Sequence, residues 1–434
     1  MKKTAGQERS SVHDLFAVVD EEVPGVRLPL PYGQAAVETT LPGSQTTVVE
    51  PVYVPGASDP AGLLRDVLQD PLRGKGLRHL VSPGQSIAIA VCDTTPPRAQ
   101  LLMIDAVLAD LAGVVDLNEV TILVVGGRRS DAAIEGLAST PGSPRVVRHD
   151  PDDAERLVWL GEHGRSIPVW LNREWFDADV RISAGVVEPH VFTGFSGGLR
   201  LVVPGLVGTD TVAGLYGSGG ECPPMAWGRT EANPVFTNGR ALAAAVGNVD
   251  FALDILLNRD QQIVAAYGGS PFHVDATARR VAGELALCAV RGRYEVVVTT
   301  NLGYPRDRTL YECIPALVAA AEIIKPGGTI VLVAQCSDGL TDLGSKPILT
   351  AMSSPDLMRS RMDFPYLGVL AKILDRANVA VYSEGVNPDE LAELGVGHTT
   401  DVGDSVRRLL ATGGPGARAC VLPEGGRTVP YRVG

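Results

Sequence analysis

SIAIAVC at residues 86–92 and VTILVV at residues 120–125 decide the fold class of this chain. Each is a short apolar run, which is typical of a strand buried on both faces of a sheet. Between them, residues 97–113 carry apolar side chains at helical spacing. A strand, a helix and a second strand in this order predict a parallel sheet covered by helices, so we expect an α/β protein.

The same alternation extends along most of the chain. In its first part we expect further strands at residues 145–148, 167–171 and 179–184, a hairpin from 250–257 and 262–267, and helices at 62–69, 235–246 and 273–291. A second alternation starts at Tyr294, with strands expected at 295–299, 329–334 and 379–382 and helices at 309–324, 363–375, 387–393 and 402–411. Both halves are therefore expected to build sheets of their own.

We predict two domains with parallel or mixed sheets covered by helices. The first spans residues 1–291, including a loose tail at 1–25, and the smaller second domain spans residues 292–434. Open α/β sheets bind ligands at the carboxyl ends of their strands. An active-site cleft is therefore expected between the two domains.

Composition and charge exclude several classes of partner. The 434 residues carry 38 Lys and Arg against 50 Asp and Glu, a net charge of −12. Nucleic acids and anionic membrane surfaces both require a basic face, so neither is expected as a partner. We expect no signal peptide behind the Met-Lys-Lys start, and no apolar run is long enough to cross a membrane. The six cysteines form no C-x-x-C pair, so reduced thiols and a cytoplasmic protein are expected.

The strongest candidate for a functional site is the stretch GVVEPHVFTGFSGGLRLVVPG at residues 185–205. Its glycines permit close approach of the backbone to a ligand, and we expect residues 185–220 to form a long structured loop. His190 is a candidate general base near neutral pH. Arg200 cannot act as a base but can hold an anion bidentately. A lone histidine is more often structural, yet the neighbours of His190 favour a functional role.

Three further stretches follow expected strands. Asp93, in CDTTPPR at residues 92–98, either hydrogen-bonds a hydroxyl-bearing ligand or caps the next helix. GGRRS at residues 126–130, with Arg128, either binds a phosphate or carboxylate or forms a solvated turn. NLGYPRDR at residues 301–308 follows the first strand of the second domain and is expected to face the first domain across the cleft.

The stretch PHVFTGFSGGLRLVVPG at residues 189–205 resembles the signature of the nickel-pincer-nucleotide lactate racemase family. The resemblance extends over most of the chain, in the same order and spacing, through PLRGKGLRHLV at 71–81, HDPDDAERLVWLG at 149–161, NLGYPRDRTLY at 301–311 and IIKPGGTIVLVAQCSDG at 323–339. It implies a racemase or epimerase, an isomerase that acts on a 2-hydroxy acid.

The resemblance also implies a cofactor and a chemistry. In that family, a nicotinate-derived nucleotide is tethered to a lysine and holds nickel, and it takes the α-hydride of the 2-hydroxy acid and returns it to either face. Two histidines move the hydroxyl proton, a third histidine ligates nickel, and an arginine and a second lysine hold the carboxylate. The substrate is therefore expected to be a small anion.

Part of the family pattern carries over to this sequence. Asp93 and His190 match the cofactor-contacting aspartate and one catalytic histidine, and the two are taken as catalytic. Tyr304 and Asp307 match the loop of the second domain, the first as a substrate contact and the second as a cofactor contact. By the same resemblance, the other cofactor contacts are Ser196, Gly197 and Gly198, together with Glu312, which replaces a glutamine of the family. Pro315 stands where the second lysine is expected.

Several chemical positions depart from the family pattern. Arg128 stands where the second catalytic histidine is expected, Arg200 replaces the tethering lysine, and Tyr216 stands at the position of the nickel-ligating histidine. Pro96 replaces the substrate arginine, with Arg98 two residues on. A guanidinium stays protonated, so neither arginine can replace the base or the nucleophile. These departures argue against a tethered nickel-pincer nucleotide, and no metal ligand is assigned.

The replacements leave two alternatives open. Arg98, Arg128 and Arg200 add positive charge around the Gly-rich stretch, which suits a multiply anionic ligand. Either the chain is a racemase or epimerase acting on a 2-hydroxy acid or related anion, or it is a repurposed member of the family without nickel chemistry. In the second case it binds an anionic metabolite or nucleotide, or catalyses a different proton-transfer reaction.

Overall fold

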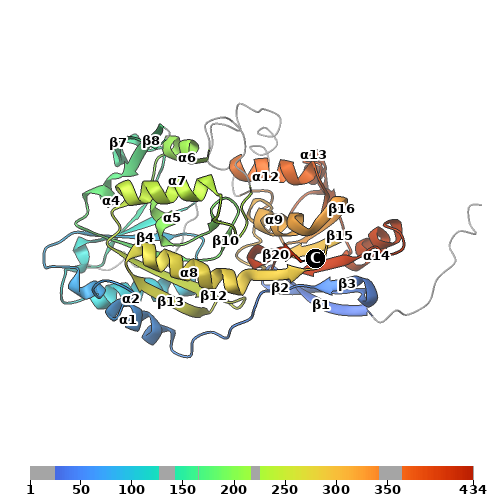
Figure 1. The fold of residues 1–434 in the computed structure, drawn as a ribbon, viewed down its shortest axis with the longest axis horizontal. Helices are drawn as coiled ribbons and strands as arrows, with labels where there is room; N and C mark the ends of the chain where they lie inside the picture. Colours follow the sequence, from blue (N-terminus) through green and yellow to red (C-terminus); the bar gives the residue numbers. More distant parts are fainter. Residues whose placement is uncertain (1–24, 127–141, 165, 217–224, 342–363, 434) are drawn as a thin grey trace, which may run out of the picture.

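Two six-stranded sheets organise the chain, each in its own α/β unit (Figure 1). The computed structural model describes residues 25–126, 142–164, 166–216, 225–341 and 364–433. In this part of the chain no helix is long and apolar enough to cross a membrane. The prediction of an α/β fold with parallel or mixed sheets covered by helices is confirmed.

The first sheet has the strand order β13-β12-β9-β4-β5-β6. Its strands are β4 (Ile87–Cys92), β5 (Val120–Val125), β6 (Arg145–Arg148), β9 (Val180–Val186), β12 (Phe251–Leu257) and β13 (Ile263–Gly269). All neighbours are parallel except the β12–β13 hairpin. Successive residues of a strand point to opposite faces, so Ile89 of β4 packs in one core and Ala90 packs in another on the far side of the sheet.

Helices cover both faces of this sheet. The face of Ile89 is packed by α1 (Pro60–Gln69) and α2 (Pro97–Leu111). The face of Ala90 is packed by α4 (Arg173–Asp177), α5 (Gly198–Val202), α6 (Thr209–Tyr216) and α7 (Pro234–Leu242). Proline at the first position of α1, α2 and α7 sets the backbone angle and lacks only an N–H that has no partner inside the helix.

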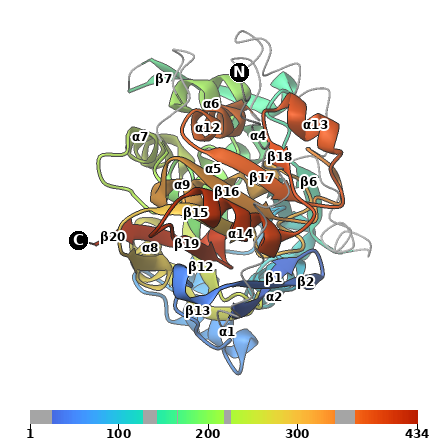
Figure 2. The same cartoon turned by 90° about the vertical axis from the view of Figure 1, so that its right-hand side faces the viewer.

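The second sheet has the order β18-β17-β16-β15-β19-β3 and is parallel throughout. Its strands are β15 (Tyr294–Thr300), β16 (Ile324–Val333), β17 (Asn378–Tyr382), β18 (Gly397–His398), β19 (Ala419–Leu422) and β3 (Thr46–Val48). Helices α9 (Ile314–Ile323) and α12 (Phe364–Leu374) cover one face. The other face is covered by α14 (Val402–Thr412) together with the hairpin of β1 (Gly25–Tyr32) and β2 (Ala35–Pro42), which Figure 2 shows beside α14.

The N-terminal segment is where the structure departs from the predicted domain division. Residues 25–48 were expected in the first domain, but β3 pairs with β19 as the edge strand of the second sheet. Leu30 and Leu41 are buried in the same core as Val298 of β15. Their sequence carries no signal for this partner, because edge strands and hairpins acquire their sheet only through contacts distant in the chain.

Three local predictions also need correction. The strand expected at 167–171 is β8 (Ile167–Asn172), but it pairs with β7 (Leu157–His163) in a separate antiparallel ribbon, where Pro168 does not interrupt a central ladder. Residues 185–220 contain two helices, α5 and α6, rather than only loop. The helix expected at 273–291 is α8 (Pro271–Ala286), after which β14 (Leu287–Val290) pairs with β20 (Val429–Arg432).

Candidate functional site

A cavity of about 460 Å³ lies where the two units meet. The first unit contributes the loops after β4, β5 and β9, and the second unit contributes the loop after β15 and the start of α9 and α12. The four loops follow the carboxyl ends of parallel strands, which is the position at which open α/β sheets bind ligands. The polar lining includes Asp93, Glu188, His190, Ser196, Arg200, Asn301, Arg306, Glu312 and Tyr366.

The structure brings together six of the residues that the sequence pointed to. They line the one cavity, and they are Asp93, His190, Ser196, Gly197, Arg200 and Glu312. Gly198 lies just behind the lining, where its N–H donates a hydrogen bond of 2.7 Å to Asp254. Arg128 falls within residues 127–141, outside the described part of the chain.

Three other predicted site residues lie away from this lining. Arg98 is exposed in the first turn of α2. Tyr304 has 48% of its surface exposed, and its backbone carbonyl accepts a hydrogen bond of 3.2 Å from Gln261 of the first unit. Asp307 is 1% exposed, and its Oδ2 accepts the backbone N–H groups of Gly33 at 2.7 Å and Gln335 at 3.0 Å. Asp307 thus holds the turn between β1 and β2 against the second sheet.

His190 is fixed by the fold of its own loop. Strands β10 (Pro189–His190) and β11 (Gly194–Phe195) form a tight antiparallel pair in which His190 lies opposite Gly194. Its Nδ1 accepts the backbone N–H groups of Phe192 and Thr193, both at 3.2 Å. Its Nε2 lies 3.1 Å from the Tyr366 hydroxyl of the second unit. Burial and the charge of Arg200 hold the pKa of His190 well below its ordinary value, so the ring is neutral.

Arg200 is the central charge of the cavity. It lies on α5, and its Nε is buried without a hydrogen-bond partner among the described residues. Burial raises the pKa of the Tyr216 hydroxyl, while the charge of Arg200 and a side-chain hydrogen bond from it act in the opposite direction. The two residues at the expected tether and nickel-ligand positions therefore contact each other. A guanidinium with an unused N–H in a cavity is a site for an oxyanion.

Glycine is required beside Asp93. A Cβ at Gly126, whose φ is +132°, would lie 1.9 Å from Oδ1 of Asp93. The carboxylate of Asp93 also forms an ion pair of 3.4 Å with Arg148 of β6. Gly126 therefore makes room for the buried carboxylate of Asp93. This packing role differs from both roles considered for residues 126–130 from the sequence, an anion site and a solvated turn.

A wall of aromatic rings closes one side of the site. Phe192 lies at its centre, with ring centroids 5.2 Å from both Tyr216 and Tyr366 and 6.2 Å from the ring of His190. Tyr311 packs against Tyr366 at 5.3 Å. The edge-to-face and tilted geometry is the favoured one for aromatic pairs. The wall joins α6 of the first unit to α12 of the second.

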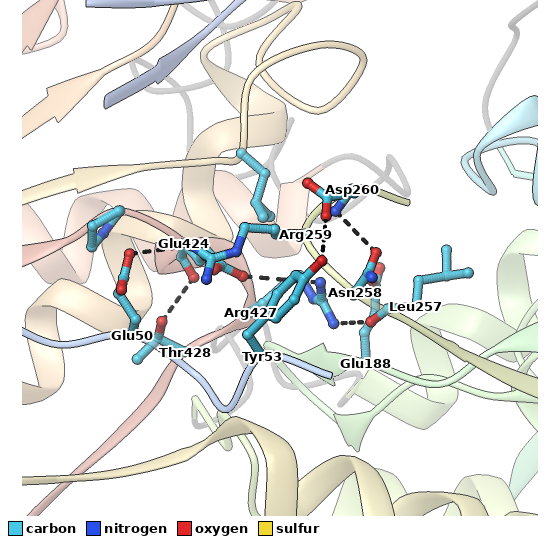
Figure 3. Close-up of polar contacts among 12 residues, drawn as sticks. Glu50, Tyr53, Glu188, Leu257, Asn258, Arg259, Asp260, Glu424, Arg427 and Thr428 are labelled. Carbon is cyan, nitrogen blue, oxygen red and sulfur yellow. Dashed lines mark hydrogen bonds and ion pairs between the residues drawn. The ribbon is translucent and has the colours of Figure 1, made fainter. Parts of the chain in front are cut away.

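An ion pair between the two units forms part of the cavity lining. Arg306 of the second unit donates a 2.7 Å hydrogen bond to Glu188 of the first. Behind it, Figure 3 shows Arg259 between Glu50 and Glu424, at 3.4 Å and 3.3 Å, and Arg427 donating to the carbonyl of Leu257. Partly buried ion pairs of this kind add little to the free energy of folding, but they favour one orientation of the two units relative to each other. They hold the two walls of the cavity in register.

A buried carboxyl supports the Gly-rich loop from below. Asp254 of β12 is 1% exposed and accepts the N–H of Gly198. Burial, reinforced by the negative charge of Asp275, raises the pKa of Asp254 to about 8. At neutral pH this carboxyl is therefore mostly protonated in the folded chain. A Cβ on Gly198 would lie 2.6 Å from the Ser183 hydroxyl and 2.9 Å from Oδ1 of Asp254. Gly197 has φ +140°, and its added Cβ would lie 3.3 Å from Oδ2 of Asp254.

We expect Asp254→Asn to change how stability depends on pH. The folded pKa of about 8 lies above the ordinary value of 3.8, so the contribution of this group is complete below pH 4. It falls by about 1.4 kcal/mol per pH unit as the pH rises toward 8, because only the unfolded chain then loses the proton. Asparagine keeps the acceptor for Gly198 and removes this slope. Urea unfolding between pH 4 and 8.5 measures it, and parallel curves for the two proteins would contradict the prediction.

Sequence reasoning missed several residues of the lining. Tyr366 and Trp227 come from segments that no motif marked, and Glu188 and Arg306 were quoted only within their stretches. A charged residue of each sign in the two predicted facing loops was the only signal available for the Glu188–Arg306 pair. No sequence signal pointed to Tyr366, because it is a single tyrosine in a helix whose sequence is mostly apolar.

Comparison with known proteins identifies the family. The family model of the lactate racemase N-terminal domain matches residues 32–217, and that of the C-terminal domain matches residues 291–429. The chain is 23% identical over 379 residues to a lactate racemase of Thermoanaerobacterium thermosaccharolyticum, covering 84% of this chain and 88% of the relative. It is 25% identical over 374 residues to a lactate racemase of Lactiplantibacillus plantarum, covering 82% and 88%.

Solved structures agree in fold. The lactate racemase apoprotein from Thermoanaerobacterium thermosaccharolyticum superposes with a TM-score of 0.80 at 22% identity, covering 94% of this chain and all of that one. A protein from Thermotoga maritima superposes with a TM-score of 0.61 at 15% identity, covering 88% of this chain. The two domain matches together span most of the chain and flank the cavity described above. The chain belongs to the lactate racemase family.

Proposed function

We propose that this chain binds a 2-hydroxy acid or a closely related small carboxylate between its two units, and that it does so without the nickel chemistry of the family. The observation that carries this proposal is Arg200, whose buried Nε has no partner among the described residues. A buried N–H of a charged group without an acceptor is destabilising unless a ligand supplies one. A carboxylate does so with two oxygens in the geometry of the guanidinium fork.

The remainder of the cavity suits a ligand of this class. Its volume of about 460 Å³ falls within the range of small-molecule sites. Next to Arg200 lie polar groups that can contact a C2 oxygen, namely the imidazole of His190 and the hydroxyl of Tyr366. Arg200 and His190 come from the first unit and Tyr366 from the second, so a bound ligand would touch both units.

The residues present do not fit the tethered nickel group that the family implies. Amide-type tethering needs a nucleophilic amine, and the guanidinium of Arg200 is protonated and hydrogen-bonded to Tyr216. The raised pKa of Tyr216 keeps it a phenol, which is a weak nickel ligand. In the described ranges no three His, Cys, Asp or Glu side chains are close enough to hold a metal ion.

Racemisation of a 2-hydroxy acid is the competing function. Family membership favours it, as does the presence of His190 in the cavity. It would require a second proton acceptor on the opposite face of the ligand. Arg128, at the position of the second histidine, stays protonated at physiological pH and cannot serve.

One experiment separates the two functions. Purified chain is titrated calorimetrically with L-lactate, D-lactate and propionate, and we expect saturable binding of at least one of these carboxylates. In parallel, the chain is co-expressed with the enzymes that make the nickel-pincer nucleotide. Its nickel content and the interconversion of D- and L-lactate are then measured. Binding without nickel or interconversion supports the proposal, nickel with interconversion favours the racemase, and absence of carboxylate binding rejects the proposal.

A further inference from the structure

The cavity has room for more than a ligand of the size of lactate. Its volume of about 460 Å³ lies within the range of sites that enclose drug-sized molecules, and lactate is much smaller than these. Under the proposed function, the carboxylate of the ligand lies at Arg200. Space therefore remains for further atoms attached to C2, and the side chains that line this space decide which atoms fit.

An acidic side chain from each unit lines the same cavity as Arg200. Glu188 follows β9 of the first unit, and Glu312 lies in the short turn before α9 of the second. The Glu188 side chain is 27% exposed, and its Oε2 accepts a hydrogen bond of 2.7 Å from Arg306. Because a carboxylate can accept about four hydrogen bonds, this contact leaves Glu188 able to accept more. Ligand atoms that meet these two acidic side chains should therefore be donors.

The charges around the cavity decide what kind of donor fits. Among the described residues, three acidic side chains and two arginines line it. A second carboxylate on the ligand would meet more negative than positive charge, which is unfavourable. An ammonium group would gain little, because Arg306 and Arg148 already compensate the charges of Glu188 and Asp93. An uncharged hydroxyl group donates a hydrogen bond and adds no charge.

A purely apolar extension of the ligand fits less well. It would take water away from Glu188 and Glu312 without replacing the lost hydrogen bonds, and burying polar groups without partners is costly. The C–H groups of a hydroxylated chain still find an apolar surface, because the rings of Tyr311 and Tyr366 pack together with centroids 5.3 Å apart and line the same cavity. A chain that carries both hydroxyl and C–H groups therefore matches both kinds of lining.

We infer that the ligand of this site is a polyhydroxy carboxylate, a 2-hydroxy acid whose further hydroxyl groups donate to Glu188 and Glu312. The inference rests on the proposed function, because it takes Arg200 as the group that holds the carboxylate. It names the class of 2-hydroxy acid that the same site prefers. Since one of the two acceptors comes from each unit, the longer ligand would make polar contacts with both walls of the cavity.

Titration calorimetry with a series of carboxylates tests the class of ligand. D-Gluconate carries further hydroxyl groups, L-malate a second carboxylate and L-3-phenyllactate an apolar ring, whereas L- and D-lactate carry none of these. Hydrogen bonds to a charged acceptor are among the stronger ones in proteins. We therefore expect gluconate to bind about 10- to 100-fold more tightly than either lactate, and we expect malate and phenyllactate to lack this gain.

Variants of the two acceptors test the contacts. Glu312→Gln keeps the shape of the side chain and replaces one acceptor oxygen by an amide donor. We expect it to weaken gluconate about tenfold more than it weakens lactate. Glu188→Gln is a second test, which also removes the ion pair with Arg306. Glu393→Gln, exposed on α13 (Pro388–Glu393) of the second unit, is the matched control, and thermal unfolding shows whether each variant is folded.

The results separate the class of ligand from the proposed function. A gluconate preference that falls in Glu312→Gln or Glu188→Gln and persists in Glu393→Gln supports the inference. Lactate, malate or phenyllactate binding as tightly as gluconate overturns it while the proposed function stands, and so does a preference that both acceptor variants retain or that Glu393→Gln loses equally. If none of these carboxylates binds to the natural chain, the proposed function is rejected and the class of ligand with it.

Discussion

Arg200→Gln is expected to lower the affinity for a small carboxylate by about 10- to 100-fold. The reason is that a charge-assisted bond to a carboxylate contributes about 1.5–3 kcal/mol, and the buried Nε of this side chain has no hydrogen-bond partner among the residues that the structure describes. Glutamine retains a polar end group on a shorter side chain, but neither the charge nor the planar guanidinium fork. Isothermal titration with L-lactate and pyruvate measures the change.

Two control variants test whether the geometry of the guanidinium or only its charge matters. Arg200→Lys keeps the charge without the bidentate geometry, so its affinity should fall between that of glutamine and arginine. Arg98→Gln removes an arginine charge that is exposed on α2 and lies outside the cavity lining, so carboxylate binding should stay within about twofold. Equal losses for Arg98→Gln and Arg200→Gln would mean that net charge, and not the clamp, attracts the ligand. Thermal unfolding of each variant separates loss of binding from loss of the fold.

Gly194→Ala is expected to destabilise the chain by about 2–4 kcal/mol. Gly194 has φ +79°, and its added Cβ would lie 2.3 Å from the carbonyl oxygen of Arg229 and 2.6 Å from the carbonyl carbon. Both are backbone atoms that cannot rotate away, so overpacking adds to the strain of the left-handed conformation. Because His190 lies opposite Gly194 in the β10–β11 pair, the imidazole should also shift. Urea unfolding measures the stability.

A matched glycine isolates the clash from the strain. Gly395 has φ +73°, close to that of Gly194, but an added Cβ would meet no atom of the described residues within 4 Å. Gly395→Ala should therefore show only the conformational penalty, about 1 kcal/mol. If the two variants lose the same stability, the contact with Arg229 is not the cause. Carboxylate binding should remain in Gly395→Ala and weaken in Gly194→Ala.

The predicted strands of both sheets appear where short apolar runs occur. SIAIAVC contains β4 and VTILVV is β5, because a strand buried on both faces must be apolar at every position. The β12–β13 hairpin also followed from local signals, since Asn258-Arg259-Asp260 supplies the turn between two apolar runs. In contrast, β3 is too short and too polar to predict its partner strand. Its pairing with β19, and the burial of Leu30 and Leu41 in the core of that sheet, place residues 25–48 in the second unit.

Some residues of the candidate site could be predicted from the sequence and others could not. The Gly-rich stretch drew attention to His190 and Arg200 because glycine, histidine and arginine in close succession have few structural reasons to occur together. The same motif reasoning pointed to Tyr304 and Asp307, which lie outside the cavity lining. Some side chains of a loop face the ligand and others face the protein. In an irregular loop the order of the residues in the chain does not predict which direction each side chain takes.

What the sequence determined by itself is the α/β class, most strand positions and the loop that carries the imidazole and the guanidinium. These depend on properties local to a few residues, namely hydrophobic period, backbone freedom of glycine and charge. Only the tertiary structure decided that Nδ1 of His190 faces two amides, that Tyr366 arrives from the other unit, and that Arg200 meets Tyr216. Hydrogen-bond direction depends on atoms that approach within about 3 Å from distant segments, and no local pattern encodes that approach.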